Sequence, residues 1–207
     1  KGVERTVSIV GQDEVDPARG HISWISPVAR ALNTGHQLPP GMEPGLQETA
    51  FYDPSNFAWS NGAQACEVEI DPATGQTRIV NYIIVDDFGV TLNPLLLAGQ
   101  VHGGAVQGIG QALMEHAIFD AQGQPIAGTF MDYALPRASD APDFSIENHS
   151  VPCKTNRLGV KGCGEAGCAG ALPSVMNAIV DALSAFGVTH IDMPVTPEKV
   201  WRILNDA

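Results

Sequence analysis

Apolar and polar side chains alternate along two stretches in the first half of the chain. Residues 65–70 and 77–85 show this period of two, which is typical of half-buried β-strands. Between them lies Asp71-Pro-Ala-Thr-Gly75, where proline presets φ and glycine accepts a left-handed turn conformation. The pattern predicts a β-hairpin. Shorter β-branched or apolar stretches predict further strands at residues 5–10 and 144–148.

Two segments near the C-terminus have the 3.6-residue period of amphipathic helices. The first spans residues 172–186, and Gly187 supplies its C-terminal stop. Its apolar positions are Leu172, Val175, Met176, Ile179, Val180, Leu183 and Phe186. The second helix is expected to begin at Thr196-Pro197.

A longer helix is predicted over residues 95–116. Asn93-Pro94 has the N-cap residue and the first-turn proline that begin helices, and no proline follows up to His116. Each glycine inside a helix costs about 1 kcal/mol relative to alanine. This helix contains five of them, at Gly99, Gly103, Gly104, Gly108 and Gly110. We therefore expect a ligand or another backbone to approach it closely.

The elements together predict an α+β fold of mixed short strands, a glycine-rich central helix and two C-terminal helices. Residues 1–49 form a loop-rich lead-in, in which Ser26-Pro27 could begin a short helix to Leu32 before the proline- and glycine-rich residues 38–45. Residues 50–207 form the remaining core.

Charge and composition exclude several classes of protein. The formal charge of −12 argues against a nucleic-acid or anionic-membrane partner. No apolar run reaches the roughly 18 residues that cross a bilayer, and the N-terminal residues lack a signal-peptide pattern. We expect a soluble, cytoplasmic protein with reduced cysteines.

The cysteine and histidine spacings predict no metal site. Of the four cysteines, Cys153, Cys163 and Cys168 match no zinc or iron–sulfur spacing, so a role as small buried side chains is the favoured interpretation for these three. The six histidines include no i, i+4 ligand pair. His102 lies in the glycine-rich helix and is interpreted as a core histidine.

The most suggestive segment for chemistry is Lys161-Gly-Cys-Gly-Glu-Ala-Gly-Cys-Ala-Gly170. Four glycines surround Glu165 just before a predicted helix, where backbone N–H groups and the helix dipole favour an anionic ligand. The alternative is a turn in which Glu165 merely benefits from the nearby helix N-terminus. A dinucleotide fingerprint is poorly supported, because residues 153–158 do not resemble a buried strand.

One face of the glycine-rich helix carries amides. Gln100, Gly104, Gln107 and Gln111 lie at helical spacing, so a heterocycle resting on Gly103-Gly104 could be hydrogen-bonded without charge. The alternative is a solvated polar face. We favour that alternative for Gln111 and a functional role for Gln100.

Several segments together resemble the molybdenum-cofactor-binding large subunit of the xanthine dehydrogenase and aldehyde oxidase family, including carbon monoxide dehydrogenase-like members. The resemblance covers roughly residues 50–206 and matches the C-terminal part of that subunit. The segments are Asp86-Asp-Phe-Gly-Val-Thr-Leu-Asn-Pro94, Gly99-Gln-Val-His-Gly-Gly-Ala-Val-Gln-Gly-Ile-Gly110, Asp132-Tyr-Ala-Leu-Pro136 and Gly159-Val-Lys-Gly-Cys-Gly-Glu-Ala-Gly167, together with the hairpin Glu67–Gly75.

The resemblance implies roles for individual residues. Glu165 would be the active-site glutamate, a base that takes a proton from a molybdenum-bound hydroxide while an electron-poor carbon is oxidised. Gln100 would contact the pterin, and Gly164 would lie against the metal end of the cofactor. The cofactor-binding residues we predict are Gln100, Gly103, Gly104, Gln107, Lys161, Gly162 and Gly164. The pterin itself would hold the metal, so no protein metal ligand is expected.

The resemblance also implies partners and a reaction. The cofactor would be a molybdenum-pterin, in its cytosine dinucleotide form, with iron–sulfur clusters and FAD on partner subunits or domains. The substrate stays open among aldehydes, purines, N-heterocycles and carbon monoxide. The family's large subunit is several times longer, so we expect residues 1–207 to be a fragment or split subunit of a molybdenum hydroxylase that is inactive in isolation. The alternative is a non-catalytic assembly module of the same fold.

Overall fold

A computed structural model describes residues 8–10, 21–23, 51, 53 and 56–205. The chain divides into two compact units, Lys1–Asp53 and Pro54–Ala207. The described part of the first unit is a parallel pair of short strands, β1 (Ser8–Val10) and β2 (His21–Ser23). β1 falls within the strand predicted at residues 5–10, whereas the helix predicted from Ser26 lies outside the described residues.

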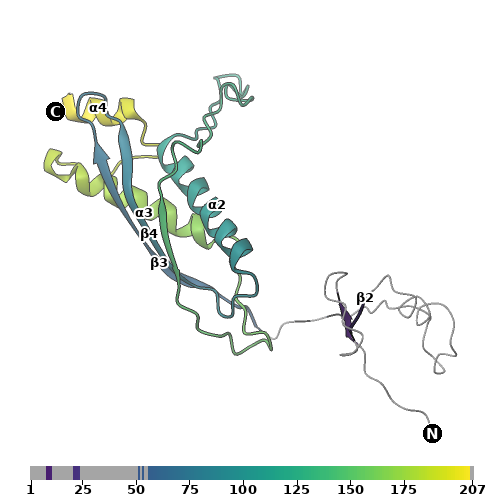
Figure 1. Ribbon diagram of the computed structural model, residues 1–207. Helices are drawn as coiled ribbons and strands as arrows, with labels where there is room; N and C mark the ends of the chain where they lie inside the picture. The colour runs from purple at the N-terminus through teal and green to yellow at the C-terminus, as the bar shows by residue number, and fades with distance from the viewer. Residues whose placement is uncertain (1–7, 11–20, 24–50, 52, 54–55, 206–207) are drawn as a thin grey trace, which may run out of the picture. The chain divides into compact units, whose positions relative to one another are not determined.

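The second unit is built on a three-stranded sheet (Figure 1). β3 (Asn61–Ile70) pairs antiparallel with β4 (Thr77–Asp87), and β4 pairs parallel with β5 (Phe144–Asn148). The predicted hairpin and the strand at 144–148 are therefore confirmed. In the hairpin turn the Asp71 carboxylate accepts hydrogen bonds from the Ala73 N–H and the Thr74 hydroxyl, and Gly75 has a φ of 72°.

A β-bulge interrupts the hairpin near its middle. Glu67 pairs with Asn81 while Val68 pairs with Ile79, so Val80 is the extra residue on β4. Val80 and Asn81 are both exposed, whereas the inner face of β4 carries the half-buried Ile79 and the buried Tyr82. The bulge thus keeps Ile79 and Tyr82 on the same core-facing side of β4, although two exposed residues lie between them.

The glycine-rich helix is α2 (Pro94–Leu113), which confirms the predicted element and its start. The side chain of Asn93 accepts a hydrogen bond from the Leu96 N–H, and Pro94 is in the first turn. The helix ends three residues earlier than predicted, where the Met114 N–H bonds to the Gly110 carbonyl.

The next helix begins earlier than its apolar period indicates. α3 spans Ala166–Ala182, so the predicted start at Leu172 was wrong by six residues. Its first turns contain small residues that pack without apolar side chains, and these give no amphipathic signal. The short 3-10 helix η3 (Ser184–Phe186) follows, ending at Gly187 with a φ of 79°, and α4 (Pro197–Asn205) begins as predicted.

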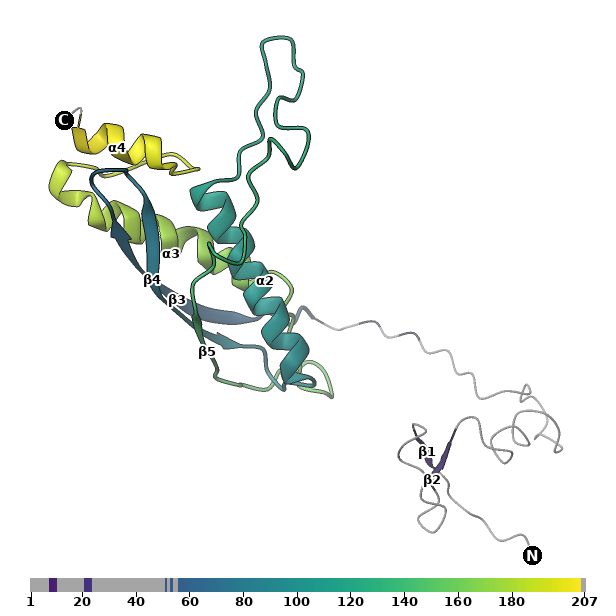
Figure 2. The ribbon, with the colours of Figure 1, turned by 45° about the horizontal axis from the view of Figure 1, so that its top comes forward.

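The core lies between the sheet and the two long helices (Figure 2). Inward-facing residues of β4 meet apolar residues of α2 and α3, and Val200 of α4 extends the same cluster. Its fully buried members include Tyr82, Ile84, Val101, Ala105, Ile109, Val175 and Ile179. Among the described helices, none has the length and apolar character needed to cross a membrane.

The backbones of α2 and α3 touch where glycines face each other. A Cβ added to Gly104 would lie 2.9 Å from the Cys168 nitrogen, and one on Gly167 would lie 2.5 Å from the Val101 oxygen. The backbone predicted to approach Gly104 is therefore α3. By contrast, a Cβ on Gly99 or Gly103 would meet nothing within 4 Å.

Candidate functional site

The glycine-rich loop before α3 starts from a short pairing with the end of β4. The Lys161 N–H donates to the Phe88 carbonyl and the Val90 N–H donates to the Gly159 carbonyl, both at 2.9 Å. Beyond Lys161 the loop is exposed at Gly162 and Gly164, and a Cβ on either glycine would meet nothing within 4 Å. Both glycines thus border open space.

Glu165 lies at the N-cap position of α3. Its side chain is exposed and makes no capping hydrogen bond. The first N–H groups of a helix have no partner inside the helix, so they add partial positive charge beside this carboxylate. The carboxylate is therefore free to act on a group bound next to the loop.

Lys161 makes a buried ion pair. Its Nζ lies 2.5 Å from Asp87 Oδ2, and the side chains are only 12% and 7% exposed. Asp87 Oδ1 also accepts hydrogen bonds from the Gly89 and Val151 N–H groups, each at 2.9 Å. The hydrogen bond from Lys161 is the main cause that lowers the pKa of Asp87 to about 2. The ammonium that we predicted as a cofactor contact is thus directed at Asp87.

Gly104 does not share an exposed face with the glutamine side chains of α2. Gln100, Gly103 and Gln107 are exposed, whereas Gly104 is buried against α3. Gln100 shares a mostly apolar groove of 300 Å³ with Lys161 and residues from the start of α2. The groove residues are Phe88, Val90, Thr91, Leu92, Asn93, Leu96, Leu97, Gln100, Val160, Lys161 and Cys163. The structure therefore brings Gln100 next to the start of the glycine-rich loop.

Two residues that sequence reasoning missed lie beneath the first turn of α3. The Tyr82 hydroxyl donates to Gln64 Oε1 at 2.7 Å, and Gln64 Nε2 donates to the Ala166 and Gly167 carbonyls, each at 3.2 Å. Gln64 occupies an inward position of β3, where the alternation would otherwise place an apolar side chain. That polar residue on the core face was the available signal.

Asp86 is a second buried acid close to this network. It is 3% exposed, and burial raises the pKa of its carboxyl group. Its Oδ2 has no hydrogen-bond partner among the described residues. Gly62 leaves room for it, since a Cβ there would collide with Asp86 Oδ1.

Three cysteines and His102 are less buried than the sequence predicted. All four cysteines are free, and Cys153, Cys163 and Cys168 are half-buried rather than buried as predicted. The interpretation of His102 as a core residue was wrong, because its side chain is exposed on α2. Its Nδ1 lies 2.7 Å from the Ala98 carbonyl oxygen, and its ring meets Phe144 edge-on. No group of three or more His, Cys, Asp or Glu residues in the described part of the chain could hold a metal ion.

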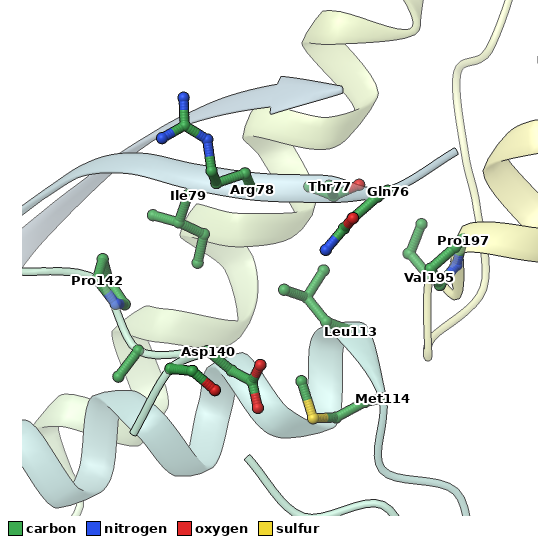
Figure 3. Close-up of a pocket in the computed structure, with 12 residues that line it drawn as sticks. Gln76, Thr77, Arg78, Ile79, Leu113, Met114, Asp140, Pro142, Val195 and Pro197 are labelled. Carbon is green, nitrogen blue, oxygen red and sulfur yellow. The ribbon is translucent and has the colours of Figure 1, made fainter. Parts of the chain in front are cut away.

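A different pocket lies at the other end of α2 (Figure 3). It has a volume of 440 Å³, and its lining includes Arg78 of β4, Leu113 of α2, Asp140 and Val195. None of the predicted site residues lines it. The glycine-rich loop, Glu165 and Gln100 therefore remain the candidate site.

The sequence matches the model of the molybdopterin cofactor-binding domain family over residues 4–142. The chain belongs to this family. It is 40% identical over 171 residues to the carbon monoxide dehydrogenase large chain of Hydrogenophaga pseudoflava, covering 83% of this chain and 21% of that one. It is 43% identical over 164 residues to the nicotine 6-hydroxylase large subunit of Paenarthrobacter nicotinovorans, covering 79% and 20%.

Two solved structures share the fold over most of this chain. Quinoline 2-oxidoreductase from Pseudomonas putida 86 aligns with a TM-score of 0.75 at 39% identity, covering 82% of this chain and 22% of that chain. A Cu,Mo-containing carbon monoxide dehydrogenase aligns with a TM-score of 0.74 at 34% identity, covering 80% and 21%. The α+β fold predicted for part of a molybdenum-cofactor-binding domain is therefore confirmed. The chain spans about a fifth of the length of these relatives.

Proposed function

We propose that the chain forms the part of a molybdenum hydroxylase large subunit that supplies the catalytic glutamate and one wall of the pterin pocket. The observation that carries this proposal is the position of Glu165 at the start of α3, in a loop bordered by open space. Its carboxylate is exposed and makes no capping hydrogen bond. Relatives that oxidise or hydroxylate small molecules, by the names they bear, support the same reaction class.

The residues around the loop fit a molybdenum-pterin cofactor. Gly103, Gly162 and Gly164 leave space that a side chain would fill, and the Gln100 amide offers both donors and an acceptor to a ring edge. No lysine or arginine occurs between Arg78 and Arg137, so in this stretch backbone N–H groups would hold anionic groups. This arrangement suits a ligand that brings its own metal and needs positioning from the protein.

In this proposal Gln100, Gly103, Gln107, Gly162 and Gly164 contact the cofactor, while Gly104 and Lys161 support them from beneath. When bound, the cofactor supplies two-electron oxidation with oxygen derived from water. Glu165 accepts the proton that is released as the new carbon–oxygen bond forms. A general base must lie within hydrogen-bonding reach of that proton, and an exposed N-cap carboxylate can reach a group placed over the loop.

The same proposal includes the form of the cofactor, the electron-transfer partners and the class of substrate. We assign the cofactor the cytosine dinucleotide form, and we place iron–sulfur clusters and FAD on partner subunits or domains that carry electrons away. The substrate is an aldehyde, purine, N-heterocycle or carbon monoxide. Residues outside this chain choose among them, because the described loop contributes mainly glycines and one carboxylate.

The substitution Glu165→Gln in the complete enzyme tests the catalytic role. It keeps the size of the side chain and removes the base, so turnover should fall roughly 10²- to 10⁴-fold. Molybdenum and cytosine-nucleotide content should stay at the wild-type level. Glu147→Gln, which neutralises another exposed glutamate on β5, is the matched control and should keep normal turnover.

Near-normal turnover of Glu165→Gln would contradict the catalytic role. Absence of molybdenum and nucleotide from the wild-type enzyme, purified with its natural partners, would favour the non-catalytic assembly module instead.

A further inference from the structure

The loop that carries Glu165 is held at its upstream end by a buried polar contact. Lys161 stands four residues before Glu165, and its ammonium bonds to Asp87 at the end of β4. Asp87 is itself held by the Gly89 and Val151 N–H groups. Together, the described hydrogen bonds to this carboxylate connect the loop, the residues at the end of β4 and the backbone at Val151.

A second buried polar contact lies at the downstream end. Gln64 of β3 donates to the carbonyls of Ala166 and Gly167, the two residues that follow Glu165. Tyr82 of β4 orients that amide by donating to its oxygen. Gln64 also packs over Gly170, where a Cβ would lie 2.5 Å from the Gln64 side chain. The first turn of α3 is thus attached to the sheet.

Between the two contacts the chain has little stiffness of its own. Only residues 162–164 separate Lys161 from Glu165, and two of these three are glycines bordered by open space. Glycine has the greatest backbone freedom of all residues, so this stretch cannot hold a carboxylate in one place unaided. The position of the Glu165 carboxylate must therefore be set by the residues at both ends of this stretch.

We propose that Asp87, acting through Lys161, and Gln64, acting through the first turn of α3, are positioning residues that fix the place of Glu165. Neither side chain touches the reacting atoms. Both belong to the β3–β4 hairpin, so the sheet carries the alignment of the catalytic carboxylate. This inference rests on the proposed function only in giving Glu165 a catalytic role.

Two substitutions of equal shape break these contacts separately. Asp87→Asn keeps an oxygen for the Gly89 and Val151 N–H groups but turns an amide donor toward the Lys161 ammonium. Gln64→Glu keeps an acceptor for Tyr82 but removes the donor to the two carbonyls. Glu69→Gln is the matched control, because it breaks an exposed ion pair with Arg78 and changes the charge as Asp87→Asn does.

Hydrogen–deuterium exchange of the complete enzyme gives the structural readout. In both variants the amides of residues 161–168 should exchange about tenfold faster than in the wild type, while those of the second half of α2 keep their rate. The control should match the wild type throughout. Unchanged exchange at residues 161–168 in both variants would overturn the anchoring.

Steady-state kinetics give the functional readout. A carboxylate displaced by about 1 Å can cost up to roughly 100-fold in rate, so kcat should fall about 10- to 100-fold. KM should stay within about twofold, because substrate contacts are untouched. An unchanged kcat together with faster exchange would overturn the positioning role.

Two further variants separate the possible failures. Should Asp87→Asn fail to assemble, Lys161→Met carries the same test, since it leaves Asp87 with its two N–H donors. Normal turnover of Glu165→Gln would remove the proposed function, yet the exchange data on residues 161–168 would still decide whether the two contacts hold the loop.

Discussion

Asp86 and Asp87 are adjacent on β4, yet their environments shift their acidities in opposite directions. Successive side chains of a strand point to opposite faces. Asp86 lies on the core face, where burial raises the pKa of its carboxyl group. Asp87 faces Lys161 and two N–H groups, which lower the pKa of its carboxyl group to about 2. Removing one partner of such a buried ion pair typically costs about 3–5 kcal/mol, because the other charge stays desolvated.

The cysteines should differ in reactivity for the same kind of reason. Burial raises the pKa of the Cys66 thiol to about 11, whereas hydrogen bonds from Thr155 lower the pKa of Cys153. The thiolate is the reactive form, so at pH 8 Cys153 should react with iodoacetamide at least about tenfold faster than Cys66. Mass spectrometry of the labelled peptides measures both rates. Equal rates would mean that the local environments of the two thiols do not control their reactivity.

The crossing of α2 and α3 gives a prediction at the scale of elements. Gly104→Ala places a Cβ 2.9 Å from the Cys168 nitrogen and forces the helices apart, at a cost of about 1–3 kcal/mol. Gly99→Ala is the matched control on the same helix, where the added methyl meets open space and favours helix by up to about 1 kcal/mol. Thermal unfolding of the complete subunit should show a lower midpoint for the first variant only. A lower midpoint for both would contradict close packing at Gly104 as the cause.

Local patterns predicted most elements of this fold and missed the contacts that join them. The hairpin, α2, β5 and α4 each have a signal within their own residues, such as the Asp71–Gly75 turn and the Asn93-Pro94 cap. The start of α3 has no such signal, because small residues packed against another helix leave no apolar period.

The candidate site was only partly predictable for a related reason. Gln100, Glu165 and the exposed glycines stood out by residue type and spacing. Asp87 and Gln64 did not, because their roles depend on partners 74 and 102 residues away in the sequence. The binding role predicted for Gly104 likewise rested on one helix, whereas its neighbour in space is a second helix.

At the scale of the second unit, large apolar side chains stay exposed. Leu95 and Leu96 are 82% and 68% exposed at the start of α2. The loop between α2 and β5 extends away from the sheet (Figures 1 and 2) and exposes Phe130 and Met131 at 85% and 93%. Patches of this kind typically mark surfaces that other protein covers. They support the proposal that this chain works as part of a longer subunit.

We therefore expect the chain expressed alone to associate and to carry no cofactor. The charge of −12 opposes association by repulsion, so association should increase with salt and as the pH approaches 4.7. Size-exclusion chromatography with light scattering at low and high salt, combined with metal analysis, measures both properties. A stable monomer at both salt concentrations with stoichiometric molybdenum would contradict the incomplete pocket.

The long sequence separation of the two loop contacts also sets the order in which the site can form. Closing a long loop costs entropy before the contact stabilises anything, so distant contacts form late in folding. During synthesis the β3–β4 hairpin emerges well before Lys161 and Ala166. The hydrogen bonds of Asp87 and Gln64 can form only after these partners have been synthesised. We therefore expect the loop around Glu165 to become ordered only after residues 161–167 have been made and have packed against the hairpin.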